Sequence, residues 1–316
     1  MSQRTEAAKS RGPRPEAPGP SGFLVVDKPA GWTSHDVVDA ARRWCGTRRV
    51  GHLGTLDPQA TGVLPLAVRD ATKLIPFVPA DPKVYRGVIR LGVETDTLDG
   101  DGQEVARHAG PLPGEDTVRD ALAGFLGEHE QVPPMYSAVK QSGVPLYRLA
   151  RRGEQVERAP RKVRIDAFAL LAFRSPDVEV EVTCSPGTYV RVLAAELGGR
   201  LGCGAYLHSL CRLRSGPFEL AQAQPFAELA AAASRGEIAA RLLRPVIALG
   251  LPTVRLTPED ARRVLHGAAL PAGGMPRAAG ERIAALDPSG SLLAILEVAA
   301  DRRLRPLRVL HRLAAR

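Results

Sequence analysis

Apolar and polar side chains alternate most strictly over residues 178–184, where three valines are separated by acidic and hydroxyl-bearing residues. A period of two is typical of a β-strand with one buried face, so this pattern predicts a strand. Residues 85–93 alternate in the same way, with two arginines on the polar side. The apolar runs at residues 22–26 and 163–173 are short enough to be further strands.

Apolar positions at helical spacing predict four helices, over residues 36–44, 117–125, 189–201 and 226–243. Thr33 or Ser34 can cap the first of them, because a hydroxyl at that position accepts a hydrogen bond from a free backbone N–H. Gly202 follows the third and is the usual residue at a helix C-terminus. The fourth is rich in alanine, the best helix former.

Glycine and proline divide the rest of the chain. Residues 50–64 contain three glycines and a proline, which predicts a structured loop rather than a helix or a regular strand. Residues 1–20 are rich in proline and polar side chains, so we expect a disordered tail. After residue 250, short apolar runs alternate with Gly and Pro, which indicates a small β-rich domain. We therefore expect a large α/β (α+β) domain over residues 21–249 and a second domain over residues 250–316.

Positive charge points to an anionic partner. The 316 residues include 43 Lys and Arg against 34 Asp and Glu, a net charge of +9. Seven basic residues lie between Arg148 and Arg164 with only two acids among them, and the final segment 302–316 has six arginines and no acid. Clustered cations favour contacts with nucleic acid phosphates, although a solvated basic surface or a compositional bias is the alternative.

The remaining composition argues against a membrane protein, a secreted protein and a zinc or disulfide framework. No apolar stretch approaches the ~20 residues that a membrane-spanning helix needs. The N-terminus lacks the apolar segment of a secretory signal, so we expect a cytoplasmic protein that makes no membrane contact. The four cysteines, at positions 45, 184, 203 and 211, form no C-x-x-C pair. This spacing favours reduced thiols over a zinc site or a disulfide framework.

Two segments resemble known ligand-binding loops but lack residues that those loops require. Residues 51–64 are glycine-rich but match neither phosphate-binding signature. Residues 96–102 resemble a calcium loop, yet aligning Gly102 with its invariant glycine puts Thr97 and His108 at the two end positions that require acids. A turn with a hydrogen-bonding carboxylate is the better interpretation. Without a metal or nucleophile-triad signature, chemistry would depend on one carboxylate, and Asp57 is the candidate, although Asp before Pro is also a common turn element.

The segment around Asp57, Gly51-His52-Leu53-Gly54-Thr55-Leu56-Asp57-Pro58-Gln59-Ala60-Thr61-Gly62-Val63-Leu64, closely resembles the catalytic motif of the TruB family of tRNA pseudouridine synthases. Other segments resemble that family's motifs in the expected order, at residues 24–31, 83–86, 131–140, 184–191, 201–205 and 210–213. The resemblance covers residues 22–217. Beyond residue 250 it is weaker and consistent with the family's RNA-binding PUA module.

The resemblance implies a pseudouridine synthase core on a mixed, largely antiparallel sheet, and three catalytic residues. Asp57 matches the nucleophile, which attacks C1′, attacks the uracil ring, or supports an elimination at the sugar. Arg191 matches the arginine that pairs with this aspartate and keeps it ionised. Tyr189 matches a second wall of the site that assists the proton steps.

Five further residues are implied in substrate binding. Tyr85 matches the residue that stacks on the flipped base, and Leu210 would pack on the opposite face, although core packing is its alternative. His52 matches a histidine that fills the gap left by the base. Lys28 and Lys73 are expected to be phosphate contacts or structural residues.

The implied activity is isomerisation of uridine 55 in the T arm of tRNA, without a cofactor or a metal, and help with tRNA folding is a further expectation. The insertion at residues 126–164 and the stand-alone layout favour direct recognition of the T stem-loop without a guide RNA, and we expect a monomer. A guide-RNA-dependent synthase of the dyskerin type shares the catalytic motif and is the first rival. A noncatalytic RNA-binding or RNA-folding protein is the second.

Overall fold

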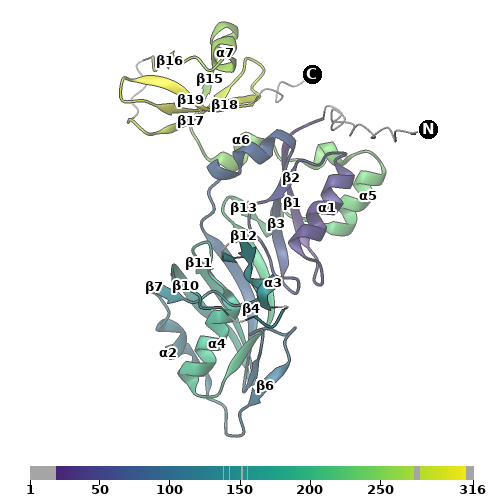
Figure 1. Cartoon of the computed structure of the whole chain (residues 1–316), viewed down its shortest axis with the longest axis vertical. Coiled ribbons are helices and arrows are strands. Elements are labelled where there is room, and N and C mark those ends of the chain that lie inside the picture. The colour runs from purple at the N-terminus through teal and green to yellow at the C-terminus, as the bar shows by residue number, and fades with distance from the viewer. Residues whose placement is uncertain are drawn as a thin grey trace, which may run out of the picture.

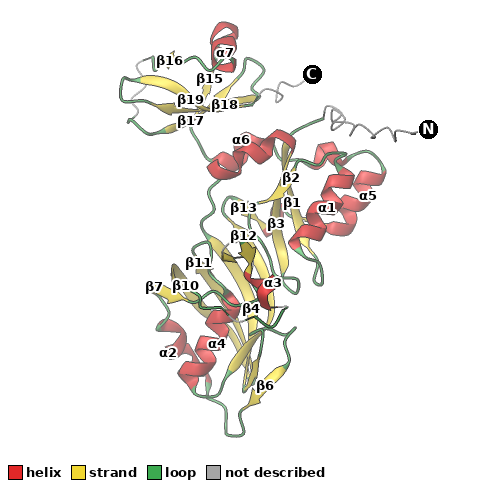
Figure 2. Cartoon of the chain, in the orientation of Figure 1, coloured by secondary structure: helices red, strands yellow, loops and turns green. Residues whose placement is uncertain are grey.

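The computed structural model describes residues 19–310, apart from residues 138, 142, 151, 155 and 274–277. Nearly all of the expected N-terminal tail, and the last two arginines of the C-terminal segment, lie outside the described residues. Figure 1 shows an elongated molecule in which a large sheet with its helices carries a smaller sheet at one end. Strands form a sheet in each part, and helices lie beside these sheets (Figure 2).

The large sheet has ten strands, eight of them in the order β14-β1-β3-β12-β4-β11-β10-β7, with β13 paired to β12 and β2 paired to β3. Their bounds are β1 (Gly22–Lys28), β2 (Val50–His52), β3 (Thr61–Val68), β4 (Lys83–Leu91), β7 (Gly127–Gln131), β10 (Arg161–Arg174), β11 (Asp177–Cys184), β12 (Ala205–Ser215), β13 (Phe218–Glu219) and β14 (Gln224–Pro225). Among the strand pairs described for this sheet, β1 with β14 and β3 with β12 are parallel. The predicted mixed, largely antiparallel sheet is confirmed.

Two hairpins lie outside this sheet. One consists of β5 (Val93–Thr95) and β6 (Glu104–Arg107), and the other of β8 (Lys140–Gln141) and β9 (Val144–Pro145). The second hairpin lies within the insertion that the sequence predicts at residues 126–164.

The helices are α1 (Ser34–Trp44), α2 (Glu115–Ala123), α3 (Leu146–Ala150), α4 (Val190–Leu201), α5 (Phe226–Ser234), α6 (Pro245–Leu249) and α7 (Pro258–Leu265), with 3₁₀ segments η1 (Arg69–Phe77), η2 (Leu220–Gln222) and η3 (Ile238–Arg241). Thr33 caps α1 in a reciprocal capping box with Asp36. Gly202 ends α4 in the left-handed conformation, at φ 70°. None of the helices described is long and apolar enough to cross a membrane.

The helix predicted over residues 226–243 is too long. α5 stops at Ser234, and Gly236, at φ 76°, follows before η3 begins. Alanine favours a helix locally but does not outweigh a glycine in the left-handed conformation.

The loop predicted over residues 50–64 is wrong at both ends, because β2 takes its first three residues and β3 begins at Thr61. Gly62 lies in β3 with φ 93°, and a Cβ added there would meet the carbonyl oxygen of Arg212 at 2.3 Å. A glycine is therefore needed for β3 to approach β12 this closely. The irregular part is limited to residues 53–60, and it contains Asp57.

The small sheet has five strands in the order β15-β17-β18-β19-β16. Their bounds are β15 (Thr253–Arg255), β16 (Leu270–Pro271), β17 (Arg282–Leu286), β18 (Leu292–Val298) and β19 (Arg303–Val309). One apolar cluster joins the two sheets, since it contains Phe23 and Leu74 from the large part with Ile295 and Leu310 from the small part. The predicted β-rich C-terminal region is confirmed, and it packs directly on the end of the large sheet.

Candidate active site

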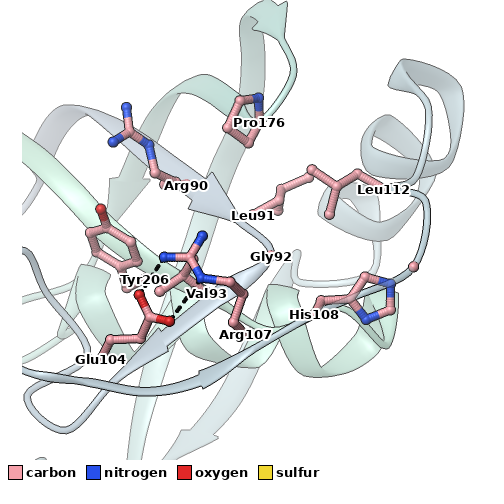
Figure 3. Close-up of a pocket in the computed structure, with 11 residues that line it drawn as sticks. Arg90, Leu91, Gly92, Val93, Glu104, Arg107, His108, Leu112, Pro176 and Tyr206 are labelled. Carbon is pink, nitrogen blue, oxygen red and sulfur yellow. Dashed lines mark hydrogen bonds and ion pairs between the residues drawn. The ribbon is translucent and has the colours of Figure 1, made fainter.

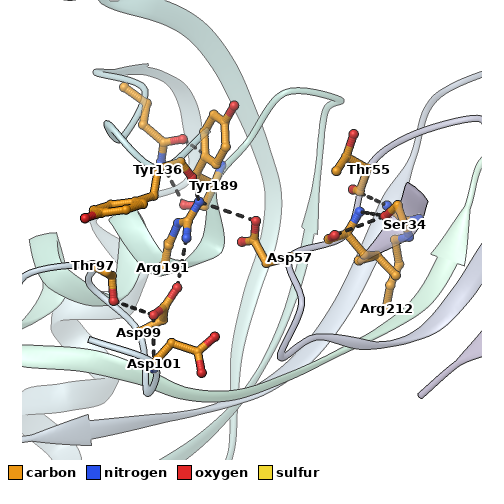
Figure 4. A network of polar contacts seen from close by, with 12 residues as sticks. Ser34, Thr55, Asp57, Thr97, Asp99, Asp101, Tyr136, Tyr189, Arg191 and Arg212 are labelled. Atoms are coloured by element: carbon orange, nitrogen blue, oxygen red, sulfur yellow. Dashed lines mark hydrogen bonds and ion pairs between the residues drawn. The ribbon is translucent and has the colours of Figure 1, made fainter. Parts of the chain in front are cut away.

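Asp57 lies in the loop between β2 and β3, and the backbone on either side of it is fixed by buried polar groups. The Ser34 hydroxyl accepts from the Leu56 N–H at 2.8 Å and donates to the Leu56 carbonyl at 3.0 Å. The Lys28 ammonium donates to the Pro58 carbonyl at 2.8 Å. The Asp57 side chain itself remains 36% exposed. These bonds fix the backbone while the Asp57 carboxylate stays partly exposed, and it points towards Arg191 in Figure 4.

Arg191 is the cation nearest this carboxylate in the network of Figure 4. It lies in the first turn of α4, and its side chain is 4% exposed. Its Nη1 donates to Oδ2 of Asp99 at 2.8 Å, and its Nη2 lies 3.4 Å from Oδ1 of Asp57. The same Nη2 donates to the carbonyl of Tyr136 at 2.5 Å. The guanidinium thus connects the loop of Asp57, the β5–β6 turn and the insertion.

Asp99 is held as firmly as the arginine it binds. Its Oδ1 accepts from the Thr97 hydroxyl at 2.5 Å and from the Asp101 N–H at 3.2 Å, which leaves Oδ2 for Arg191. The sequence identifies this segment as a turn with a hydrogen-bonding carboxylate but gives no sign of the partner. Asp99 and Arg191 are 92 residues apart, so only the folded chain brings them together.

The charges around Asp57 shift the pKa of its carboxyl in opposite directions. Desolvation raises the pKa of the Asp57 carboxyl, and the negative charge of Asp99 raises it further. The positive charge of Arg191 opposes both, and that of Lys28 does so to a smaller extent. Asp57 therefore depends on Arg191 to remain ionised towards lower pH.

Tyr189 is the residue that precedes α4, and Gln131 holds its backbone. The Gln131 amide accepts from the Tyr189 N–H at 2.7 Å and donates to the Tyr189 carbonyl at 3.2 Å. Gln131 is 1% exposed, at the end of β7. The ring of Tyr189 faces Arg191, whose Cζ lies 5.9 Å from the ring centroid. Sequence reasoning did not single out Gln131, although it begins one of the motifs that carry the resemblance.

Tyr85 and Leu210 lie on the neighbouring strands β4 and β12. Tyr85 is 8% exposed within the main core cluster, and Leu210 is partly buried against the same cluster. Desolvation raises the pKa of the Tyr85 phenol, while the nearby charge of Arg212 opposes this rise. Both residues pack in or against the core, so core packing is observed for Leu210, and its packing against the base stays a prediction.

His52 ends β2, and its Nδ1 accepts from the Gly54 N–H at 3.3 Å. Burial lowers the pKa of this imidazole, and the charge of Arg212 adds to the effect. The lowered pKa indicates a neutral ring. The acceptor role of Nδ1 places the proton of that ring on Nε2.

Lys28 and Lys73 both make contacts within the protein, and a phosphate contact of Lys73 stays a prediction. Lys28 is fully buried, and its ammonium donates to the carbonyls of Pro29, Trp32 and Pro58 at 2.6–2.9 Å. These three bonds use all of its donors, and burial lowers its pKa to about 8. The Lys73 ammonium lies 3.1 Å from Oδ1 of Asp70, in an ion pair on η1.

Arg212 is a further residue that sequence reasoning passed over. It is 1% exposed and donates to three carbonyls of the loop and of β3. Its Nε binds Val63 at 2.8 Å, its Nη1 binds Thr55 at 3.2 Å, and its Nη2 binds Gly54 at 3.1 Å. Arg212 lies in residues 210–213, one of the segments that resemble the family's motifs, and this was the available signal. Nothing in the sequence indicates that this arginine is buried.

A separate hollow of about 490 Å³ lies by the β5–β6 hairpin, lined among others by Arg90, Arg107 and Tyr206 (Figure 3). Arg90 is bound by Asp177, and Arg107 by Glu104. No residue of the Asp57 network lines it. Within the described residues, no three His, Cys, Asp or Glu side chains are grouped to hold a metal ion.

Comparison with known proteins gives matches over most of the chain. The family model for the N-terminal domain of TruB family pseudouridylate synthases matches residues 42–190, and that for the C-terminal part of tRNA pseudouridine synthase II matches residues 251–311. The tRNA pseudouridine synthase B of Geotalea uraniireducens is 47% identical over 247 residues, 78% of this chain and 80% of that protein. That of Dehalococcoides mccartyi, strain BAV1, is 41% identical over 92% of this chain and 97% of its own.

Solved structures share the fold. A chain in a Cbf5-Nop10-Gar1 complex is 26% identical, with a TM-score of 0.68 over 93% of this chain and 85% of its own length. A chain in an H/ACA RNP bound to a substrate RNA containing 2′-deoxyuridine aligns with a TM-score of 0.69 over 98% of this chain and 93% of its own. At 22% identity, this second likeness concerns the fold alone.

Proposed function

This chain belongs to the TruB family of pseudouridylate synthases, and we propose that uridine 55 in the T arm of tRNA is the base that it isomerises. The chain is a tRNA pseudouridine synthase, an isomerase, with relatives of that name at 41–47% identity. The observation that carries the site assignment is the accessible Asp57 carboxylate 3.4 Å from Arg191, which Asp99 holds from behind.

Asp57 is the proposed nucleophile. Isomerisation breaks the C1′–N1 bond, turns the uracil and forms a C1′–C5 bond, so no group is gained or lost and no redox step is involved. The carboxylate either attacks C1′ or the ring, or supports an elimination at the sugar. In each route it must be ionised, which is what the guanidinium of Arg191 favours. The ring of Tyr189 faces the Arg191 guanidinium, and Tyr189 is the proposed wall that assists the proton steps.

The target base must leave the helical stack to reach Asp57, at a cost of a few kcal/mol. Stacking on an aromatic ring returns about 1–3 kcal/mol per base. Tyr85 is the proposed stacking residue, with Leu210 on the opposite face. His52 carries a neutral ring on the loop that bears Asp57, and we assign it to the gap left by the base.

Affinity is assigned to the basic segments. Arg152 and Arg161 are exposed in the insertion at residues 126–164, and exposed arginines recur on β19. Since each phosphate contact releases counterions, such residues supply sequence-independent binding.

We propose a catalytic domain over residues 21–249 and an RNA-binding PUA-like domain over residues 250–316. We also propose that the protein is a cytoplasmic monomer that binds the T stem-loop without a guide RNA.

The test is direct. Purified protein would be incubated with unmodified tRNA alone and pseudouridine mapped by position, alongside a tRNA in which uridine 55 is replaced by cytidine. We expect one pseudouridine, at position 55, and none in the replaced tRNA. Modification only when a guide RNA is added, or at another position, would overturn the proposal.

A further inference from the structure

Two cations are buried together beneath the Asp57 loop without an acid to neutralise them. Lys83 is 5% exposed and Arg212 is 1% exposed. Neither takes part in any ion pair found among the described residues. Asp81 is close enough to influence Lys83, but its carboxylate lies 2.7 Å from Arg164. The hydrogen-bond acceptors of the two cations are neutral: the Ser215 hydroxyl at 2.6 Å for Lys83 and three carbonyls for Arg212.

Both cations approach the same point of the loop. A Cβ placed on Gly54 would lie 3.6 Å from the Lys83 ammonium and 3.7 Å from Nη1 of Arg212. They also flank the proposed stacking residue, since Lys83 and Tyr85 are two residues apart on β4 and Arg212 is paired with Tyr85 across the β4–β12 ladder. The two charges therefore lie under both the nucleophile's loop and the ring on which the base would stack.

Such an arrangement is unfavourable for stability alone. Removing a cation from water is strongly unfavourable unless an anion is paired with it, and two like charges in one place add repulsion. Apolar side chains of similar volume would avoid this cost. A preorganised positive charge, however, stabilises negative charge that develops during a reaction, and it does so strongly where water is excluded.

We propose that Lys83 and Arg212 are positioning residues of the isomerisation, and that their charges stabilise the negative charge left on the uracil. When the C1′–N1 bond breaks, its electron pair stays with the base, so charge moves onto the ring stacked on Tyr85. Arg212 also sets the distance between that ring and Asp57, because it holds the loop carbonyls at 54 and 55. The inference rests on the proposed function and deepens it.

Lys83→Met tests the charge at nearly constant side-chain length. We expect single-turnover pseudouridine formation to fall at least about tenfold at neutral pH, with the affinity for tRNA little changed. Ser215→Ala is the matched control when it is assayed well below pH 8, because it removes the hydrogen bond of Lys83 while the ammonium stays protonated. It should keep most of the rate.

The pH dependence separates an electrostatic role from a structural one. Desolvation lowers the pKa of Lys83 to about 8, and the charge of Arg212 adds to this. Lys83 is charged below that pH and neutral above it, so the ratio of wild-type to Lys83→Met rates should be large below about 8 and approach one above it. Arg212 keeps its charge throughout, and burial raises the pKa of the Cys184 thiol, which also faces Lys83, to about 11. Lys28 titrates in both proteins and cancels in the ratio.

The outcomes are distinct. A ratio that stays constant with pH, or a variant as fast as wild type, would overturn the inference. If thermal melting shows that Lys83→Met does not fold, Lys83→Arg gives the reciprocal test: it keeps its charge, so its rate should exceed that of wild type increasingly above about pH 8. Arg212→Lys, which keeps the charge but not the forked donors, should lose about 10²-fold in rate. The proposed function itself fails only if wild type makes no pseudouridine at position 55.

Discussion

Replacing Arg191 by lysine tests the link between the arginine and the ionisation of Asp57. The guanidinium makes contacts at 2.8 Å to Asp99, 3.4 Å to Asp57 and 2.5 Å to the Tyr136 carbonyl, in three directions. A lysine carries its charge at one point on a flexible stem and cannot reproduce this planar fork. We expect it to keep the contact with Asp99, which is the nearer and the more buried of the two acids, and to lose that with Asp57.

The magnitude follows from the lost contact. A hydrogen bond between charged groups contributes about 1.5–3 kcal/mol, and each 1.4 kcal/mol is a factor of ten, so the single-turnover rate should fall roughly 10- to 150-fold. The pH profile should change as well. Asp57 acts only when ionised, and a lysine charge that stays on Asp99 lies farther from Asp57. It opposes the desolvation of the Asp57 carboxyl less, so the pKa of Asp57 should rise further. The acid limb of the rate profile should therefore move to higher pH.

The assay is single-turnover pseudouridine formation from mildly acidic to neutral pH, with Asp99→Asn as the opposing variant. The charge of Asp99 raises the pKa of Asp57, so removing it should move the acid limb to lower pH even though the rate falls. If the acid limbs of the two variants' pH–rate profiles move in opposite directions, the titrating group is identified as Asp57. If the limb of Arg191→Lys stays in place or moves to lower pH, this reasoning is refuted.

Three further predictions concern metal, affinity and architecture. Release of tritium from tRNA labelled at uridine C5 should continue in EDTA; a loss of release that added metal restores would contradict the carboxylate mechanism. Arg152→Ala combined with Arg161→Ala should weaken tRNA binding and reduce its salt slope by about 1–2, as measured across a salt series. An unchanged slope with a slower single-turnover rate would place these residues in the chemistry instead. Gln131→Leu should lower the free energy of unfolding by about 1–3 kcal/mol, because it leaves the Tyr189 N–H without the acceptor that it has at 2.7 Å. Denaturant melts measure this, and a stability equal to wild type would show that the contacts are dispensable.

The elements with strong local signals were predicted well from the sequence. Alternating valines gave the strand that the structure places at Asp177–Cys184, and a hydroxyl cap with helical spacing gave Ser34–Trp44. The helix over residues 226–243 was predicted too long although Gly236 is a local signal for its end. The error at residues 50–64 arose where a contact distant in the chain decides the conformation. β3 continues through Gly62 because β12 lies against it, and nothing in the local glycine content indicates this.

The residues of the site also divide into those that a local motif identified and those whose contacts are distant in the sequence. Asp57 and Arg191 were found through motifs, and the structure brings them within 3.4 Å, although their catalytic roles stay predictions. Asp99, Gln131 and Arg212 were missed because each acts on a backbone or a charge far away in sequence. Lys28 was considered for a phosphate contact because charge alone suggests one, while its burial and its three carbonyl partners become visible only in the fold.

The central claim is that Asp57 performs the chemistry, and Asp57→Asn tests it most directly. The amide keeps the size of the side chain and removes the nucleophilic charge, so a reaction path is lost rather than slowed by the ~10²–10⁴-fold typical of an acid-base group. Asp39→Asn, on the exposed face of α1, is the matched control, and thermal melting checks both folds. Mapping position 55 after a single turnover should show no pseudouridine for Asp57→Asn, with tRNA affinity close to that of wild type. Pseudouridine formed at a rate near that of wild type would contradict the account, because Asn serves a turn as well as Asp does.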